Sequence, residues 1–185
     1  GLEDNKKARE LVEFANIADT GGRTDRIYKL DKIIKCHSNE PEILHRIAWI
    51  LVEHGLDFMK DLWLKNEWKR LEKWLEKGKK IVNSIVNTAI KKGIKHLIVD
   101  LVKGFPRLSM SDLQWEYLRR GGEVIIVINR MKEPDPVCPK IVSENSMNYV
   151  RISIRVAKNS DFDARKFTEK IGGGGHIKAA GARIS

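Results

Sequence analysis

Four consecutive glycines near the end of the sequence are the residues most suggestive of chemistry. Gly172, Gly173, Gly174 and Gly175 directly follow a predicted helix and lead into His176 and Lys178. Ordering glycine costs more backbone entropy than ordering any other residue, so four in a row within a domain need a reason. Successive N–H groups in such a turn can form a nest that binds an anion. We therefore predict a phosphate-binding loop, to which His176 adds a hydrogen-bond donor and Lys178 a positive charge.

This loop differs from the common nucleotide-binding motifs. Its glycine spacing does not fit G-x-G-x-x-G, and no G-K-[ST] follows it. The alternative interpretation is a flexible linker, but linkers usually contain serine and run longer, and this segment lies tightly between apolar stretches. A phosphate-binding loop of another kind is the favoured interpretation.

A predicted strand over residues 149–156 carries the second group of candidate ligands. Arg151, Ser153 and Arg155 stand at alternate positions, so all three side chains project from one face of the strand. Arginine suits bidentate contact with phosphate, whereas a core has no use for two guanidinium groups. The alternative is an edge strand whose charges are simply solvated.

The elements that must position these residues change character along the chain. Apolar residues recur at three- and four-residue spacing in the first half, which predicts helices near residues 5–18, 27–34, 41–55 and 57–89. The compact apolar runs at 96–102 and 123–129 predict buried strands, and a helix over 109–120 between them predicts a βαβ unit. The strand at 149–156, a helix at 161–170 and a last strand at 182–184 complete the pattern.

The predicted fold class is therefore α/β, with a helical N-terminal and linker region followed by a mixed β-sheet flanked by helices. Four tryptophans fall in the helical region: Trp49, Trp63, Trp68 and Trp74. Such residues can stack on nucleic-acid bases. At helical spacing, however, aromatic side chains are more often part of the core, and we expect that here.

The composition indicates a globular protein with a polyanionic partner. The 185 residues are 42% hydrophobic and 32% charged, with a formal net charge of +10. An excess of lysine and arginine attracts phosphate-bearing molecules without specifying a sequence. The alternative is a lysine-rich surface that serves solubility.

The two cysteines and the apolar runs bear on the cellular location. Cys36 and Cys138 lie far apart and in no C-x-x-C arrangement, which argues against a disulfide framework and against a cysteine-type zinc site. No apolar run approaches the roughly 18 residues that span a bilayer. We expect a cytoplasmic protein with no membrane partner.

The ISIR strand at residues 152–155, a short helix and GGGGHIKAAG at 172–181 together resemble the signature of the DHHA1 domain. This domain is the C-terminal partner in the DHH phosphoesterases, which include RecJ-type exonucleases, nano-RNases and cyclic-dinucleotide phosphodiesterases. The resemblance covers roughly residues 93–185. It implies that Gly173–Gly175, His176, Ser153 and Arg155 hold substrate phosphate. Many members continue S-x-R-S, where this sequence has Val156.

A second segment, FANIADTGGR at residues 14–23, is similar to the fourth motif of the DHH domain, whose aspartate binds a metal. The similarity implies that Asp19 is a ligand for Mn²⁺ or Mg²⁺, ions that prefer carboxylate oxygens. Paired metals of this kind stabilise phosphoryl displacement. From spacing alone, Asp19 is equally suited to a turn or helix cap. The remaining histidines lack ligand spacing, and we expect them at the surface or in the core: His37, His45, His54 and His96.

Taken together, the resemblance implies the C-terminal, substrate-binding part of a metal-dependent phosphodiesterase or exonuclease acting on single-stranded DNA, single-stranded RNA or oligonucleotides. DNA repair or replication proteins would be further partners. The predicted division is a DHH remnant at 1–43, connecting helices at 44–92 and a DHHA1 domain at 93–185. No complete catalytic site is present, so this chain alone should be inactive. The alternatives are a non-catalytic nucleic-acid-binding or replication-associated module and a phosphodiesterase for short or cyclic dinucleotides.

Overall fold

The computed structural model describes residues 6–19, 24–101, 105–130, 135–138 and 150–184. Contacts divide the chain into two compact units. Unit 1 comprises Gly1–Trp74 with Pro134–Ser143, and unit 2 comprises Leu75–Glu133 with Glu144–Ser185. Helices come first and a five-stranded mixed sheet follows, so the predicted α/β class is confirmed. None of the described helices is long and apolar enough to cross a membrane.

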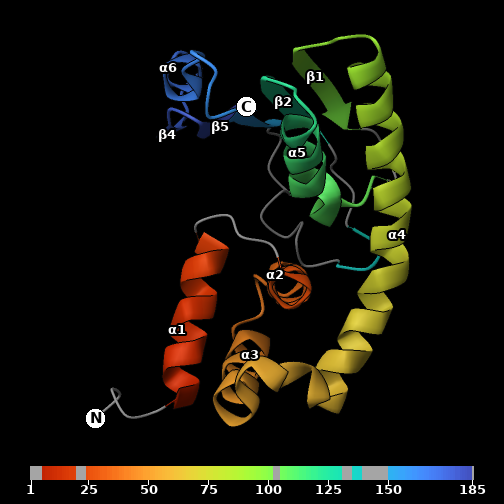
Figure 1. The fold of residues 1–185 in the computed structure, drawn as a ribbon, viewed down its shortest axis with the longest axis vertical. Coiled ribbons are helices and arrows are strands. Elements are labelled where there is room, and N and C mark those ends of the chain that lie inside the picture. The colour runs from red at the N-terminus through yellow and green to blue at the C-terminus, as the bar shows by residue number, and fades with distance from the viewer. Residues whose placement is uncertain (1–5, 20–23, 102–104, 131–134, 139–149, 185) are drawn as a thin grey trace. The chain divides into compact units, whose positions relative to one another are not determined.

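Unit 1 is helical (Figure 1). Its elements are α1 (Lys6–Asp19), α2 (Asp25–Cys36), α3 (Pro41–His54), the 3-10 helix η2 (Gly55–Lys60) and the first part of α4 (Leu62–Lys91). Thr24 caps α2, because its hydroxyl oxygen accepts a hydrogen bond from the N–H of Ile27 at 3.2 Å. Pro41 opens α3 in its first turn, as predicted, and Gly55 ends it with a φ of 58°.

A disulfide joins α2 to the described segment 135–138 of unit 1. Cys36 and Cys138 are bonded with a Cα–Cα distance of 5.1 Å, across 102 positions of sequence. The expectation that these cysteines do not pair is wrong, because their spacing along the chain carries no information about which segments of the fold meet. Asp135 supports the same segment, since its carboxylate accepts hydrogen bonds from the N–H groups of Val137 and Cys138 and from the indole of Trp74.

None of the four tryptophans of α3 and α4 is fully buried. Trp49 is 63% exposed, and Trp63, Trp68 and Trp74 are half-buried. The expectation of core tryptophans is wrong for Trp49, and the other three are only partly buried. The buried positions of these helices are occupied instead by smaller side chains: Ile27, Ile33, Ile47, Phe58, Leu64 and Leu71.

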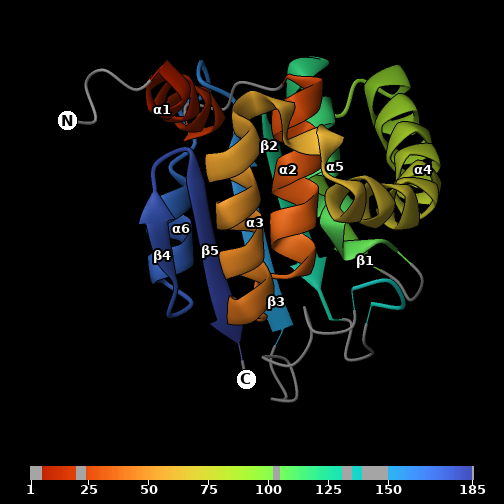
Figure 2. The ribbon, with the colours of Figure 1, turned by 90° about the horizontal axis from the view of Figure 1, so that it is seen from below.

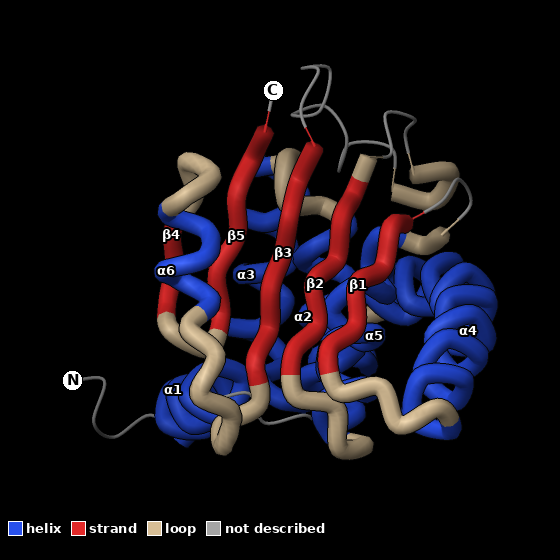
Figure 3. The backbone as a smooth tube through the Cα atoms, turned by 90° about the horizontal axis from the view of Figure 1, so that it is seen from above, coloured by secondary structure: helices blue, strands red, loops and turns tan. Residues whose placement is uncertain are grey.

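Unit 2 is built on a sheet with strand order β1-β2-β3-β5-β4 (Figure 3). The strands are β1 (His96–Leu101), β2 (Val124–Asn129), β3 (Val150–Val156), β4 (Gly174–His176) and β5 (Ala179–Ile184). β1 and β2 are parallel and are connected through η3 (Arg107–Ser109) and α5 (Met110–Arg119), which confirms the predicted βαβ unit. The remaining pairs are antiparallel.

Two apolar clusters hold helices against opposite faces of this sheet. On one face, Val86 of α4 and Leu113 and Tyr117 of α5 pack with Ile125 and Val127 of β2. Each such aliphatic side chain contributes about 1.5–3 kcal/mol when fully buried.

On the other face, α6 (Ala164–Glu169) lies beside β4 and β5 (Figure 2). Ala164 of this helix packs with Ile154, Val156 and Ala180. The alternation of side chains along β3 thus separates an apolar set that faces α6 from a polar set on the opposite face.

Candidate anion-binding site

The strand register gathers the predicted phosphate ligands on one face of the sheet. Arg151, Ser153 and Arg155 alternate along β3 and therefore project to the same side, as expected. Directly paired residues of antiparallel strands also share a face. The pairs across β3, β5 and β4 are Arg151 with Arg183, Ser153 with Gly181 and Gly174, and Arg155 with Ala179 and His176. We call this set of eight residues the arginine face.

Arg155 and His176 stand at either side of Ala179. Two strand spacings, roughly 10 Å at the backbone, separate the two residues. Ala179 between them carries only a methyl side chain. The His176 side chain is exposed. The strand register therefore places the predicted ligands Arg155 and His176 on the same face of the sheet, two strands apart.

The surroundings of Arg155 disfavour the charged form of its guanidinium group. Partial burial of the guanidinium and, second, the positive charge of Arg151 lower the pKa of Arg155 below its ordinary value. No described carboxylate opposes this shift. Arginine stays protonated in proteins, so Arg155 keeps its positive charge and can contact an anion.

Ser153 is held by a residue that the sequence did not single out. The side-chain amide of Gln114, which is 3% exposed, donates to Oγ of Ser153 at 3.0 Å and to its backbone oxygen at 3.3 Å. Because Oγ accepts this bond, the hydroxyl proton can point elsewhere and donate to a ligand. The sequence places Gln114 between Leu113 and Tyr117, on the apolar side of the helix predicted over 109–120. A polar residue on that side is expected to be buried and to need a hydrogen-bond partner.

The predicted nest is not formed by the start of the glycine run. The N–H groups of Ile171, Gly172 and Gly173 donate to backbone oxygens of Thr168 and Glu169 at 2.8–3.3 Å, and so close the end of α6. The rest of the run is the short strand β4, which pairs with β5. This strand was not predicted. Anion contacts from this region would therefore come mainly from side chains of the arginine face.

The glycines of the run serve different purposes. A Cβ on Gly175 would lie 2.6 Å from the backbone oxygen of Ala179, and its φ of 139° favours glycine. A Cβ on Gly173 would lie 2.4 Å from the backbone oxygen of Gly181. A Cβ on Gly174 would meet nothing within 4 Å. Packing therefore requires glycine at 173 and 175 but not at 174.

Beside these glycines the surface is hollowed. A hollow of about 470 Å³ is lined by Gly172–Gly174, by Arg151 and Arg183, and by Ile152, Gly181 and Ala182. Arg183 was not among the predicted ligands. Gly181 and Arg183 alternate along the last strand and therefore share one face. The pairing of β5 with β3 is needed to show that this is the face of Arg151 and Ser153.

Lys178, predicted to add a positive charge to the glycine loop, has a hydrogen-bond partner elsewhere. Its ammonium group donates to the backbone oxygen of Ser160, and its backbone oxygen accepts from the N–H of Val156. Lys178 and Ile177 form the turn between β4 and β5, so the side chain is used to fix that turn against the segment before α6. We assign it a structural role.

The proposed metal ligand lies at the edge of what the structure describes. Asp19 is the last residue of α1, and its side chain is outside the described part of the molecule. Within the described ranges, no group of three or more His, Cys, Asp or Glu residues could hold a metal ion. The other histidines lie apart: His37 contacts Glu40 and Glu67, His45 contacts Trp49, and His96 lies 3.7 Å from Glu123.

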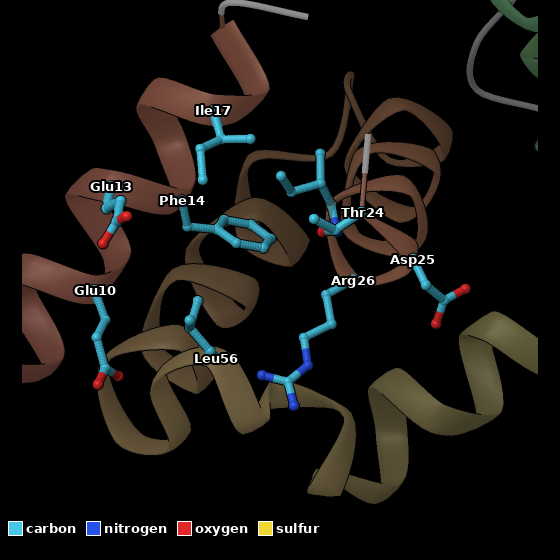
Figure 4. Close-up of a pocket in the computed structure, with 9 residues that line it drawn as sticks. Glu10, Glu13, Phe14, Ile17, Thr24, Asp25, Arg26 and Leu56 are labelled. Atoms are coloured by element: carbon cyan, nitrogen blue, oxygen red, sulfur yellow. The ribbon is translucent and has the colours of Figure 1, made fainter. Parts of the chain in front are cut away.

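Unit 1 has a pocket that the sequence did not suggest (Figure 4). Its volume is about 530 Å³, and Phe14, Ile17, Ile27 and Leu56 supply most of its apolar lining. Glu10, Glu13, Thr24, Asp25 and Arg26 also line it. Arg26 makes an ion pair with Asp57 at 3.7 Å. The lining gathers no nucleophile with a base, so it suggests no reaction.

Comparison with known protein families gives no match to this chain, and comparison with curated protein sequences gives none either. Among solved structures, an uncharacterized protein from Helicobacter pylori G27 aligns with 17% sequence identity and a TM-score of 0.36. The alignment covers 100% of this chain, which spans 56% of that protein's length. A structural similarity with so low a TM-score and sequence identity supports no inference about function.

Proposed function

We propose that this chain is the substrate-binding part of a metal-dependent phosphodiesterase or exonuclease that acts on single-stranded nucleic acid or oligonucleotides. One observation carries the proposal: Arg155, Ser153 and His176, which the family resemblance marks as phosphate ligands, share one face of the sheet. The net charge of +10 supports a polyanionic substrate.

In this proposal the arginine face binds the phosphate of the substrate and takes no part in hydrolysing it. Arg155 offers a planar fork of donors that matches two oxygens of a phosphate, and Ser153 offers a hydroxyl proton positioned by Gln114. His176 adds a donor from the opposite side of Ala179. The described residues do not fit a metal ion, so no step of hydrolysis is assigned to them. Mn²⁺ or Mg²⁺, with Asp19 as a ligand, remains a prediction for the complete protein.

The experiments below also distinguish two alternative functions. A non-catalytic binding module, such as a replication-associated relative of RecJ, would use the same face without hydrolysis. A phosphodiesterase for short or cyclic dinucleotides would bind a dinucleotide as tightly as a longer strand. The high positive charge favours the longer substrate.

The test compares His176→Ala with His96→Ala. Both histidines are exposed residues on strands of the same sheet, but His96 lies on β1, far from the arginine face in strand order. We expect His176→Ala to weaken binding of labelled single-stranded DNA or RNA about tenfold, the loss expected for one charge-assisted hydrogen bond. Fluorescence anisotropy measures this, with circular dichroism to check the fold. Equal affinities for the two variants would contradict the proposal.

A second measurement separates an enzyme from a binding module. The complete protein is incubated with Mn²⁺ and end-labelled single-stranded DNA, single-stranded RNA and a dinucleotide. The proposal expects metal-dependent cleavage that His176→Ala strongly reduces. Salt-sensitive binding without cleavage would support the binding module, and preferential cleavage of the dinucleotide would support the third function.

A further inference from the structure

We propose that Cys36 and Cys138 form a reversible thiol–disulfide site, in which Cys36 is the sulfur that accepts the electron pair when the bond is reduced. Its reaction partners would be dithiol reductants and, in the reverse direction, small disulfides. The inference is independent of the proposed function. Both cysteines and the residues around them belong to unit 1, whereas the arginine face belongs to unit 2.

A guanidinium group lies directly beside one of the two sulfurs. Nη2 of Arg70 donates to Sγ of Cys36 at 3.5 Å. A cation in this position stabilises a thiolate, which is the form in which a cysteine attacks or leaves in thiol–disulfide exchange. The other terminal nitrogen, Nη1, donates to the backbone oxygen of Val137 and so holds the guanidinium group beside the bond. Arg70 therefore favours Cys36 as the leaving sulfur.

The surroundings of Cys138 act in the opposite direction. Its backbone N–H donates to Oδ1 of Asp135 at 3.1 Å, and the N–H of Val137 donates to the same oxygen at 3.0 Å. These bonds keep a carboxylate near Cys138, and one negative charge disfavours a second one close by. The two ends of the disulfide thus differ in electrostatic environment, with a guanidinium group at Cys36 and a carboxylate near Cys138.

Two negative groups oppose a thiolate at Cys36. This residue is the last of α2, where the helix dipole is negative, and Glu67 lies 2.6 Å from Nη2 of Arg70. A helix dipole contributes about 0.3–1 kcal/mol, whereas a hydrogen bond to a charged group contributes about 1.5–3 kcal/mol. The contact of Arg70 with the sulfur therefore outweighs the dipole. Glu67 weakens this contact without replacing it, so its removal should strengthen the effect of Arg70.

Exchange requires the segment at 135–138 to move away from α2. Cys36 is 2% and Cys138 1% exposed, so the closed bond lies too deep for a reductant. The segment itself is neither helix nor strand, and Pro136 within it is exposed. Irregular segments at a surface open at lower free energy than the core does. We therefore expect reduction without global unfolding, at a rate set by this local opening.

The proposed reaction is a two-electron exchange. A thiolate of the dithiol attacks Sγ of Cys138, the bond between the cysteines breaks, and its electron pair leaves on Sγ of Cys36 beside Arg70. The second thiol of the reductant gives its proton to solvent and attacks its own sulfur in the mixed disulfide. Cys138 then leaves and takes up a proton. The dithiol has become a disulfide, and the chain has gained the two electrons.

The experiment measures how readily the folded chain is reduced. The wild-type chain, Arg70→Gln and Glu67→Gln are equilibrated at neutral pH with graded ratios of reduced to oxidised dithiothreitol. Thiols are then trapped by acid and alkylation and counted by mass spectrometry. Arg26→Gln is the matched control, because Arg26 is another arginine of unit 1 and pairs with Asp57 at 3.7 Å. Circular dichroism before and after reduction checks the fold.

We expect the two variants to shift in opposite directions. Arg70→Gln should need about a tenfold higher ratio for half reduction, the loss expected for one hydrogen bond to a charged group. Glu67→Gln should need a lower ratio, because Arg70 is then left to the sulfur. A purely structural role would loosen the segment in both variants and shift both the same way. The control should match the wild type.

A second measurement identifies the reactive sulfur. Cys138→Ser leaves only the thiol of Cys36, and Cys36→Ser leaves only that of Cys138. Each single-cysteine variant is mixed with a small aromatic disulfide, and the released thiol is followed by absorbance. We expect Cys36 to react about tenfold faster than Cys138 near neutral pH, because the contact with Arg70 raises its thiolate fraction.

Four results would overturn the inference. The wild-type bond could stay oxidised until urea unfolds the chain, which would make it purely structural. Arg70→Gln could match the control, or Arg70→Gln and Glu67→Gln could shift in the same direction. Cys138 could also react as fast as Cys36. The proposed function would stand in each case, since His176→Ala tests it separately in unit 2.

Discussion

Arginines in the two units are used in opposite ways. In unit 1, Arg70 pairs with the carboxylate of Glu67 at 2.6 Å and donates to the backbone oxygen of Val137. The same carboxylate contacts His37, whose other ring nitrogen faces Glu40. We call these residues the Arg70 cluster. Arg70 thus has a carboxylate partner, and the cluster ties α2, α4 and the segment at 135–138 together.

In unit 2, the arginine face gathers charges of one sign. Arg155 and Arg151 lie on the same strand, Arg183 lies opposite Arg151, and the pKa of Arg155 is lowered first by partial burial and second by the charge of Arg151. The comparison teaches that net charge indicates the class of partner, whereas the local arrangement of charge shows which arginines have a structural role.

The largest expected effect is the loss of stability when the disulfide of unit 1 is removed. Replacing both bridged cysteines, as Cys36→Ser with Cys138→Ser, should lower the free energy of unfolding by about 2–4 kcal/mol, the usual contribution of a disulfide that closes a long loop. Phosphate binding at the arginine face should be unchanged under native conditions. Urea denaturation with and without dithiothreitol measures the first effect. Identical midpoints for the wild-type chain in the two conditions would show that the bridge is absent.

The glycines beside the arginine face should give an intermediate effect. Gly175→Ala should cost about 1–3 kcal/mol, because a side chain there is strained by the positive φ and collides with Ala179. Gly174→Ala should stay within about 0.5 kcal/mol, as expected for a surface change without strain. Denaturation midpoints of the two variants test this difference. Equal losses would mean that packing alone explains the whole glycine run.

The smallest effect concerns acid stability of the Arg70 cluster. Burial acts to raise the pKa of Glu67, but hydrogen bonds from Arg70 and His37 outweigh it and leave the pKa lowered. The ionised Glu67 therefore stabilises the fold above the ordinary pKa of glutamate, and this contribution disappears as pH falls through the lowered pKa. We expect about 1 kcal/mol or less, since Arg70 is partly exposed to solvent.

Urea titrations at a series of pH values measure this acid effect. Glu67→Gln should give a flatter acid profile than the wild type, because glutamine does not titrate. Asp163→Asn offers a control carboxylate in unit 2, where Asp163 caps α6 through the N–H of Lys166. A wild-type profile that Glu67→Gln leaves unchanged would assign the acid sensitivity to other carboxylates.

Much of the fold followed from periodicity, and much of the site did not. The order of helices and strands, the βαβ unit and the shared face of Arg151, Ser153 and Arg155 were predictable because each depends on neighbours along the chain. The roles of Arg183 and Gln114 depend on strand register and on the packing of α5, which the local alternation and the helix periodicity do not specify by themselves. Strand β4 was missed because glycine is depleted in strands and gives no alternation to recognise.

The disulfide also changes how this protein could be dissected. Residues 135–138 belong to unit 1, although they lie between β2 and β3 of unit 2 in the sequence. A gene fragment that ends after α4 would encode Cys36 without Cys138. Conversely, a protease that cuts once between positions 36 and 138 would leave two polypeptides joined by the Cys36–Cys138 bond. They would migrate as one band on a gel until a reductant separates them.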